Sequence, residues 1–161
     1  MVITSYGLSC FKVTSGERVI AFDPPSKKSK LKSPYFQTDM VLLSHSHDDH
    51  SGKDGLPGKD DTSPFLIEGP GEFEYKDISV IGIPSFHDHS EGKKEGLNTM
   101  YRVRFEDVIL LHLGDFGEKE VRPDIKEKFG EIDVLFLPIG GETVIDPETA
   151  AKIANIIEPR I

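Results

Sequence analysis

Short apolar runs alternate with turns along most of the chain, and they predict strands rather than long helices. β-branched and aromatic residues fill these runs, while Gly, Pro, Ser and Asp bound them, as is typical of strands in hairpins. The turns between the first three runs are so short that we expect an antiparallel meander. The predicted strands cover residues 2–6, 10–14, 18–22, 41–43, 65–67, 71–75, 78–84, 100–105, 108–113 and 133–139.

Two helices are predicted near the end of the chain. Val121, Ile125 and Phe129 recur at helical spacing before a glycine, which commonly follows the last turn of a helix. Asp146 precedes a second helical pattern as an N-terminal cap does, and its apolar face consists of residues 150, 153, 154 and 157. The strands form two groups around the Gly- and Pro-rich segment 53–61, which we expect to be irregular, with helices late in each half.

Three histidines and two aspartates follow the apolar run 41–43 within six positions. At an extended strand end, residues two apart project to the same side, so His45 and His47 can converge on one ion. Asp49 and His50 follow where the chain must turn, and they can aim at a second point nearby. The pattern therefore predicts two neighbouring metal subsites. The alternative is a solvated polar loop with incidental histidines.

Length, charge and composition limit the class of protein to which the chain can belong. We expect a single domain over residues 1–161, because a chain of this length can bury one core. The formal charge of −9 argues against nucleic acid as a partner, since such binding needs a cationic surface. Two divalent ions would offset about four of these charges. The chain start does not resemble a signal peptide and no apolar run could cross a bilayer, so we expect a cytoplasmic protein without a membrane partner.

Three further features receive no predicted chemistry. Cys10 is the only cysteine, so no internal disulfide can form, and its strand-like surroundings indicate a buried, inert thiol. Glu72 and Glu74 alternate with aromatic residues, as in a strand with one wet face, and we assign them no catalytic role. Residues 26–34 form a cationic loop that we expect to be solvated surface; the alternative is that it guides an anionic substrate.

The spacing His45-x-His47-x-Asp49-His50 after an apolar strand resembles the signature of the metallo-β-lactamase-fold hydrolases. The opening residues 6–11 and the strand that ends in Asp23-Pro24 are similar to the branch that includes L-ascorbate-6-phosphate lactonase-like proteins. The resemblance covers nearly the whole chain. It implies an α/β (α+β) fold, a four-layer αββα sandwich, with metal loops that meet at one edge of two sheets; periodicity alone predicts only mixed α and β structure.

The resemblance also implies the roles of individual residues. His45, His47 and His87 would hold the first ion, Asp49 and His50 would help to hold a second, and Asp115 would bridge the two. Asp23 would orient a ligand histidine from behind, the alternative being a turn cap. The remaining histidines have lesser expected roles: His89 is the alternative to His87, and His112 is expected to be packed or to support a ligand.

The chain departs from the family pattern at two places. Glu118 stands where relatives often have histidine, and no histidine follows His112, so the last ligand of the second subsite is absent. We expect a C-terminally short form, truncated after Ile161. The alternatives are that Asp49, His50 and Asp115 hold the second ion with solvent or a partner group in the gap, or that only the three-histidine site is occupied.

The expected function is metal-dependent hydrolysis of a small ester, lactone or phosphoester. A water between two cations would lose its proton near neutral pH, and Asp49 and Asp115 are the expected catalytic carboxylates. Zinc is the expected ion, with manganese or iron as alternatives. The partner would be a small-molecule substrate, and the oligomeric state is not predicted. The alternative functions are a metal-binding domain without turnover and, disfavoured by charge, a phosphodiesterase or nuclease.

Overall fold

The structure is a computed structural model that describes residues 1–53, 55–60 and 62–161. It contains two compact units, Met1–Glu68 and Gly69–Ile161, and each is described by itself. Each unit contains one five-stranded sheet. Asp54 and Asp61, which belong to the segment 53–61 predicted to be irregular, lie outside the described residues. The single domain expected over residues 1–161 stays a prediction.

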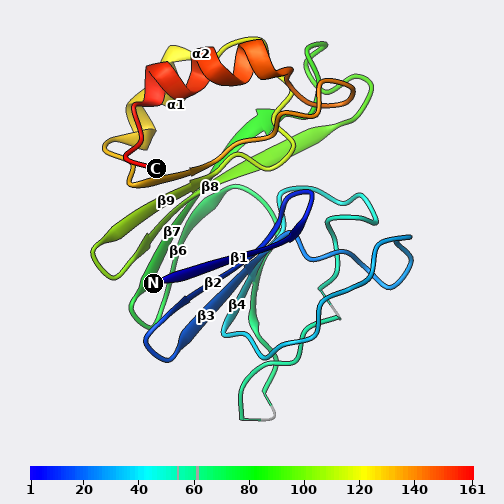
Figure 1. The fold of residues 1–161 in the computed structure, drawn as a ribbon, viewed down its shortest axis with the longest axis vertical. Helices are drawn as coiled ribbons and strands as arrows, with labels where there is room; N and C mark the ends of the chain where they lie inside the picture. Colours follow the sequence, from blue (N-terminus) through cyan, green and yellow to red (C-terminus); the bar gives the residue numbers. More distant parts are fainter. Residues whose placement is uncertain (54, 61) are drawn as a thin grey trace. The chain divides into compact units, whose positions relative to one another are not determined.

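The first unit begins with the predicted antiparallel meander, β1 (Val2–Gly7), β2 (Cys10–Ser15) and β3 (Arg18–Phe22). Two short strands, β4 (Met40–Leu42) and β5 (Phe65–Ile67), continue the sheet in parallel with β3, in the order β1-β2-β3-β4-β5 (Figure 1, blue to cyan). Phe22 pairs with Leu42, so β3 and β4 end at the same level. The residues that follow both strands therefore leave the sheet side by side.

The helix expected late in the first half is not found in the described part of the first unit. The described residues between 43 and 64 form loops and turns, in agreement with the irregularity predicted for this part of the chain. Gly52, Gly55, Pro57 and Gly58 interrupt this segment, and glycine and proline are the poorest helix formers. A small core of Ala21, Val41, Leu43 and Leu56 packs the segment onto the sheet instead.

The second unit is a sheet with the order β10-β9-β8-β7-β6, antiparallel except for the parallel pair β9 and β10 (Figure 1). Its strands are β6 (Gly71–Tyr75), β7 (Ile78–Phe86), β8 (Leu97–Phe105), β9 (Val108–His112) and β10 (Val134–Phe136). Strands β7 and β8 are longer than predicted, because pairing continues from Ile78–Phe105 to Phe86–Leu97. The chain thus reaches His87 directly from the sheet. Glu72 and Glu74 lie on the exposed face of β6, as predicted.

Helices α1 (Pro123–Phe129) and α2 (Pro147–Ile157) lie over one face of this sheet (Figure 1). Burial of their apolar stripes holds them there. The shared core includes Ile83, Met100, Leu111, Ile125, Phe129, Ala150 and Ile153. Val121 precedes α1 rather than lying within it, because Pro123 starts the helix. Neither helix of the described chain is long and apolar enough to span a bilayer.

Asp146 caps α2, as the sequence predicted, by accepting a hydrogen bond from the Thr149 amide at 2.7 Å. We expect Asp146→Ala to lower the melting temperature by about 2–4 °C, because the cap satisfies an otherwise unbonded amide. Thermal unfolding followed by circular dichroism measures the change. Glu142→Ala, which alters a nearby exposed acid, is the control, and equal effects of the two substitutions would contradict the capping role.

Candidate metal centre

The histidine loop, residues 44–50, follows β4 in the first unit and gathers three imidazoles. The His45 ring centroid lies 4.7 Å from that of His47 and 4.4 Å from that of His50. Strand β4 ends at Leu42, and the loop bends where the His50 amide donates to the His47 carbonyl at 2.9 Å. His45 and His47 therefore lie together, as predicted, but they belong to the loop that follows β4 rather than to an extended strand end. The turn between His47 and His50 adds the third imidazole.

A buried carboxylate, Asp23, lies behind this loop, directly after β3. Its Oδ1 accepts the Ser44 amide at 2.6 Å and its Oδ2 accepts the Ser44 hydroxyl at 2.7 Å. The Nδ1 of His50 lies 3.6 Å from the same Oδ2. The Asp23 backbone has a left-handed conformation, with φ of 41°, which is unusual outside glycine. These contacts support the expected orienting role over a simple turn cap.

Ser44 links Asp23 to His45. Its Oγ lies 2.8 Å from His45 Nδ1. Because the hydroxyl proton is donated to the Asp23 carboxylate, the oxygen can only accept from Nδ1, which must carry the imidazole proton. Nε2 of His45 then holds the lone pair that a metal ligand needs. Sequence reasoning missed Ser44, since its partner is 21 positions away along the chain.

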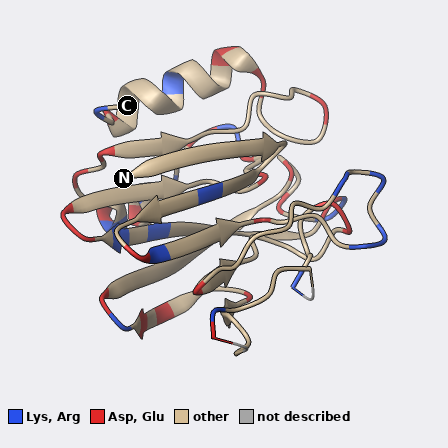
Figure 2. Ribbon diagram, turned by 60° about the horizontal axis from the view of Figure 1, so that its bottom comes forward, with Lys and Arg blue, Asp and Glu red and all other residues tan. Residues whose placement is uncertain are grey.

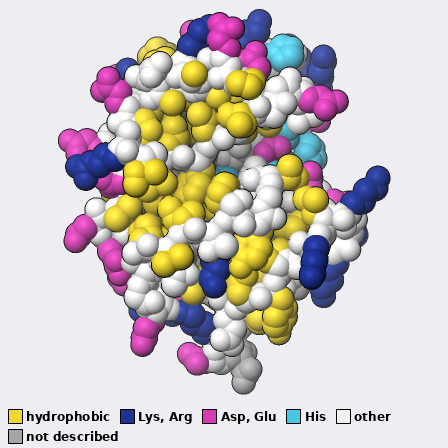
Figure 3. Space-filling model, in the orientation of Figure 1, with side chains coloured by type: hydrophobic (Ala, Val, Ile, Leu, Met, Phe, Trp, Pro, Cys, Tyr) yellow, Lys and Arg dark blue, Asp and Glu magenta, His cyan; other side chains and the backbone are white. Residues whose placement is uncertain are grey.

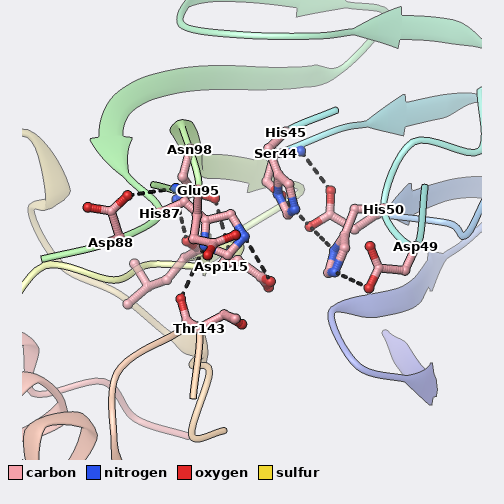
Figure 4. Close-up of polar contacts among 12 residues, drawn as sticks. Ser44, His45, Asp49, His50, His87, Asp88, Glu95, Asn98, Asp115 and Thr143 are labelled. Atoms are coloured by element: carbon pink, nitrogen blue, oxygen red, sulfur yellow. Dashed lines mark hydrogen bonds and ion pairs between the residues drawn. The ribbon is translucent and has the colours of Figure 1, made fainter. Parts of the chain in front are cut away.

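Asp49 and His50 lie side by side (Figure 4). The Asp49 side chain is partly exposed to solvent, whereas His50 is buried. His50 is 2% exposed, and its Nε2 lies 3.7 Å from Asp49 Oδ2. The Asp49 side chain is 44% exposed. Asp49 can therefore meet solvent or a substrate, whereas His50 is held between two carboxylates, those of Asp49 and Asp23.

Cys10 is buried beside Asp23, as expected for an inert thiol. Burial, and secondarily the charge of Asp23, raises the pKa of the Cys10 thiol to about 12. The thiolate is the nucleophilic form of cysteine, and it is scarce near neutral pH at such a pKa. The prediction that Cys10 is no nucleophile is confirmed.

In the second unit, His87 directly follows β7 and is buried between two oxygen atoms. Its Nδ1 lies 3.2 Å from the Thr143 carbonyl oxygen, and its Nε2 lies 3.4 Å from Asp115 Oδ2 (Figure 4). A carbonyl can only accept, so Nδ1 carries the proton and Nε2 presents its lone pair on the side of Asp115. His89 is exposed on the following loop. Burial and contacts thus favour His87 over His89 as a ligand.

Asp115 follows β9, and a buried amide side chain, Asn98, fixes its backbone. Asn98 Oδ1 accepts the Asp115 amide at 3.0 Å, while Nδ2 donates to the Leu113 carbonyl at 2.9 Å and to Ser85 Oγ at 2.8 Å. Asn98 is 1% exposed, so water does not compete for these bonds. Sequence reasoning missed this role of Asn98, because its partner Asp115 is 17 positions away along the chain.

Asp88 organises the loop that follows His87. It accepts hydrogen bonds of 2.6–3.2 Å from the backbone amides of Ser90, Gly92, Lys94 and Glu95. These bonds, that of Glu95 foremost, lower the pKa of Asp88 to about 2. The charged carboxylate therefore holds the loop together through these hydrogen bonds. Its position in the sequence did not indicate this role.

Glu118, which stands where the family resemblance implies histidine, holds the end of β7. Its Oε1 accepts the Phe86 amide at 3.1 Å, and its Oε2 lies 3.2 Å from Arg122 Nε. Arg122 also donates to the Pro84 carbonyl at 3.1 Å. Burial raises the pKa of Glu118. The replacement thus has a structural role, because it anchors the residue that precedes His87.

His112 is packed rather than open, in agreement with its expected role. It is 2% exposed, its ring centroid lies 5.6 Å from that of Phe136, and its Nδ1 accepts the Gly114 amide at 3.1 Å. The remaining predicted site residues divide between the units. The structure brings Asp23, His45, His47, Asp49 and His50 together in the first unit, and His87 and Asp115 together in the second.

The donor groups of each unit suit a divalent metal ion. The first unit offers three imidazoles and the Asp49 carboxylate, and the second offers an imidazole and a carboxylate, which are common zinc ligands. In each unit one histidine has its Nδ1 proton occupied by an oxygen, Ser44 Oγ for His45 and the Thr143 carbonyl for His87. Such partners orient a ligand imidazole and keep Nε2 available for metal.

We expect Ser44→Ala to weaken zinc binding by about 10- to 100-fold, because it removes the hydroxyl that links His45 to Asp23. Competition with a chromogenic chelator measures the affinity. Ser46→Ala, at an exposed position of the same loop, is the matched control. Equal affinities for the two variants would contradict the orienting role of Ser44.

We expect Asp88→Asn to speed amide hydrogen exchange at its backbone partners, because a neutral side chain accepts more weakly. The folded-state pKa of about 2 lies below the ordinary value of about 3.9, so the stabilisation by the carboxylate is complete above that ordinary value and is lost as pH falls towards 2. Exchange measured by NMR at pH 5 and pH 2 tests this. The difference between variant and wild type should shrink at pH 2, and Glu91→Gln should change neither rate.

Comparisons with known proteins cover nearly the whole chain. The sequence model of the beta-lactamase superfamily domain matches residues 2–161. A protein of Thermococcus onnurineus named UPF0173 metal-dependent hydrolase is 26% identical over 180 residues, covering 96% of this chain and 79% of the relative. A Pyrococcus horikoshii protein of the same name is 30% identical over 145 residues, covering 76% of this chain and 63% of the relative.

Solved structures share the fold. A candidate zinc-dependent hydrolase of the metallo-beta-lactamase superfamily from Thermotoga maritima has a TM-score of 0.78 at 29% identity, over 98% of this chain and 71% of that one. A candidate metal-dependent hydrolase from Parabacteroides distasonis has a TM-score of 0.75 at 19% identity, over 98% of this chain and 78% of that one. The predicted α/β class and metallo-β-lactamase fold are confirmed. The chain belongs to the beta-lactamase superfamily domain family.

Proposed function

We propose that this chain, a metal-dependent hydrolase of the metallo-β-lactamase superfamily, joins the donor groups of its two units in one two-metal centre. The proposed reaction is hydrolysis of a small ester, lactone or phosphoester. The observation that carries the proposal is the histidine loop, in which the ring centroids of His47 and His50 lie within 4.7 Å of that of His45, with buried Asp23 behind the loop. A solvated loop with incidental histidines would not need a buried carboxylate behind it.

In this proposal His45, His47 and His87 hold the first ion. Burial and the Thr143 contact support His87, since they present its Nε2 and leave His89 in solvent. Asp49 and His50 help to hold the second ion, and Asp115 bridges the two with its separate carboxylate oxygens.

A bound divalent ion would lower the pKa of a coordinated water and polarise the bond to be cleaved. We propose zinc, on the basis of the imidazole-rich donor set; manganese and iron are compatible with the same groups. Which of these metals the protein binds in the cell depends on the availability of each metal as well as on its affinity for the site.

The open side chain of Asp49 is the group proposed to handle protons. Hydrolysis forms a bond from the water oxygen to the carbonyl carbon or phosphorus and breaks the bond to the leaving oxygen, which takes up a proton. Asp49 is 44% exposed, so it can orient the water, accept its proton and return it to the leaving oxygen. Asp115, with 15% of its side chain exposed, is restricted to the metal side of the centre.

The narrower assignments rest on sequence features. We propose a single domain over residues 1–161, a place in the lactonase-like branch, and action in the cytoplasm on a small molecule. The supporting features are the motif order from Asp23 to Asp115 and a single, buried cysteine with no disulfide requirement.

Two variants test whether both units serve one centre. We expect His47→Ala in the first unit and His87→Ala in the second each to reduce hydrolysis and zinc content, the rate by about 100-fold or more, because each removes a ligand. Elemental analysis gives the metal content, and initial rates on a 4-nitrophenyl ester, a lactone and bis(4-nitrophenyl) phosphate give activity.

His89→Ala is the matched control, since it removes an exposed histidine near His87. If His89→Ala lost as much metal as His87→Ala, the ligand assignment would be wrong. Stoichiometric metal in a wild-type protein that hydrolyses none of these substrates would favour a metal-binding domain without turnover.

A further inference from the structure

One segment of the first unit has a charge opposite to that of the protein. No Asp or Glu occurs between Asp23 and Asp39, although the chain has 28 acidic residues and a net charge of −9. The same segment contains four lysines within six positions, Lys27, Lys28, Lys30 and Lys32. We call residues 26–33 the lysine loop. It lies within the cationic segment 26–34 described above. Its net charge is positive, whereas that of the whole protein is negative.

The lysine loop is fastened to the histidine loop by backbone hydrogen bonds within the first unit. The Ser26 amide donates to the Asp48 carbonyl at 2.8 Å, and the Gly52 amide donates to the Pro24 carbonyl at 2.7 Å. A Cβ at Gly52 would lie 2.3 Å from the Pro25 carbonyl oxygen, so only glycine permits this approach. The lysines are therefore attached beside the imidazoles, rather than on a remote part of the surface.

Hydrogen bonds inside the lysine loop give it a defined course. Ser26 Oγ accepts the Lys28 amide at 3.2 Å, Ser29 Oγ accepts the Leu31 amide at 3.1 Å, and the Ser33 hydroxyl donates to the Pro25 carbonyl at 2.7 Å. These bonds are local turns of the kind that serine side chains form. The charged groups are thus presented by an ordered series of turns.

The four lysine side chains are exposed to solvent. Figure 2 shows blue segments on loops of the chain, and Figure 3 shows Lys and Arg side chains that project from the surface. Within residues 1–53, 55–60 and 62–161, other cations such as Lys53, Lys59 and Arg122 lie within 4.0 Å of an acid, whereas no ion pair involves these four. The loop is joined to the backbone of Asp48, and the next residue is Asp49 of the proposed metal centre. The positive charge is therefore available to a ligand.

We propose that the lysine loop binds the anionic group of the substrate, so that this hydrolase acts on a small molecule with a carboxylate or phosphate remote from the bond that is cleaved. The inference rests on the proposed function, because it needs the histidine loop to be the reaction centre. Lysine is a flexible point charge that suits such anions, and a cluster of like charges raises the local substrate concentration. Neutral esters lack the group that the loop recognises.

The test compares two esters of equal chain length that differ in a terminal carboxylate. The holoenzyme is assayed with 4-nitrophenyl hexanoate, which is neutral, and with mono-4-nitrophenyl adipate, whose carboxylate lies too far along the chain to attack its own ester readily. The variant Lys27→Gln/Lys28→Gln/Lys30→Gln/Lys32→Gln is compared with Lys76→Gln/Lys126→Gln/Lys128→Gln/Lys152→Gln, which changes the net charge equally on exposed residues of the second unit.

We expect the lysine-loop variant to raise KM for the adipate ester about 10-fold at low salt, with kcat unchanged and with KM for the hexanoate ester altered less than about twofold. The increase should fade in 0.5 M salt, where the screening length is only a few ångströms. The control variant should leave both KM values near wild type.

Three results would overturn the inference. If the two variants change KM equally, the effect is one of net charge alone; if both esters respond equally, the loop does not read the anion. Binding of a 12-nucleotide single-stranded RNA that depends on the four lysines, without discrimination between the esters, would indicate a nucleic-acid surface. In all three cases hydrolysis of the hexanoate ester would leave the proposed function intact. A metal-loaded wild type that cleaves neither ester would overturn the inference, and the proposed function would fail with it only if the lactone and bis(4-nitrophenyl) phosphate were not cleaved either.

Discussion

The buried contact between Asp23 and Ser44 is the constraint on which the histidine loop depends. Two hydrogen bonds, 2.6 and 2.7 Å long, fix the first residue of the loop to the end of the neighbouring strand. A buried carboxylate is costly unless its oxygens are satisfied, so the pairing of β3 with β4, which brings Asp23 to Ser44, also makes its burial tolerable. From Ser44 outwards, each imidazole position follows from this anchor and from the turn at His50.

The second unit also holds its proposed ligand residues in place by hydrogen bonds, but other groups form them. There an amide side chain, Asn98, fixes the backbone of Asp115, and a backbone carbonyl, that of Thr143, fixes the tautomer of His87. The adjacent loop is arranged around the charge of Asp88. In both units, therefore, the side chains proposed as ligands follow a strand end and are held there by hydrogen bonds to neighbouring groups. Rigid support of this kind is what metal sites require.

The contiguous features were predictable from the sequence, and the features that depend on distant pairing were not. The strands, the cap of α2 and the dense run from His45 to His50 have local signals, and the structure confirms these elements. Ser44 and Asn98 look ordinary in the sequence, because their partners are 21 and 17 residues away. The helix expected in the first half is not found in the described residues. The sequence already contained the reason, because the glycines and Pro57 of this segment are poor helix formers. The bond of Glu118 to the Phe86 amide joins residues that are 32 positions apart, so it could not be predicted from the sequence.

The buried thiol of Cys10 can be used to measure opening of the first sheet. Alkylating reagents attack the thiolate, and in the native state the group is both inaccessible and protonated, with a pKa near 12. On opening of the first sheet the same sulfur would regain an ordinary acidity and react. Since the chain has a single cysteine, the rate of its labelling would measure how often the strands around Asp23 separate, without any engineered probe.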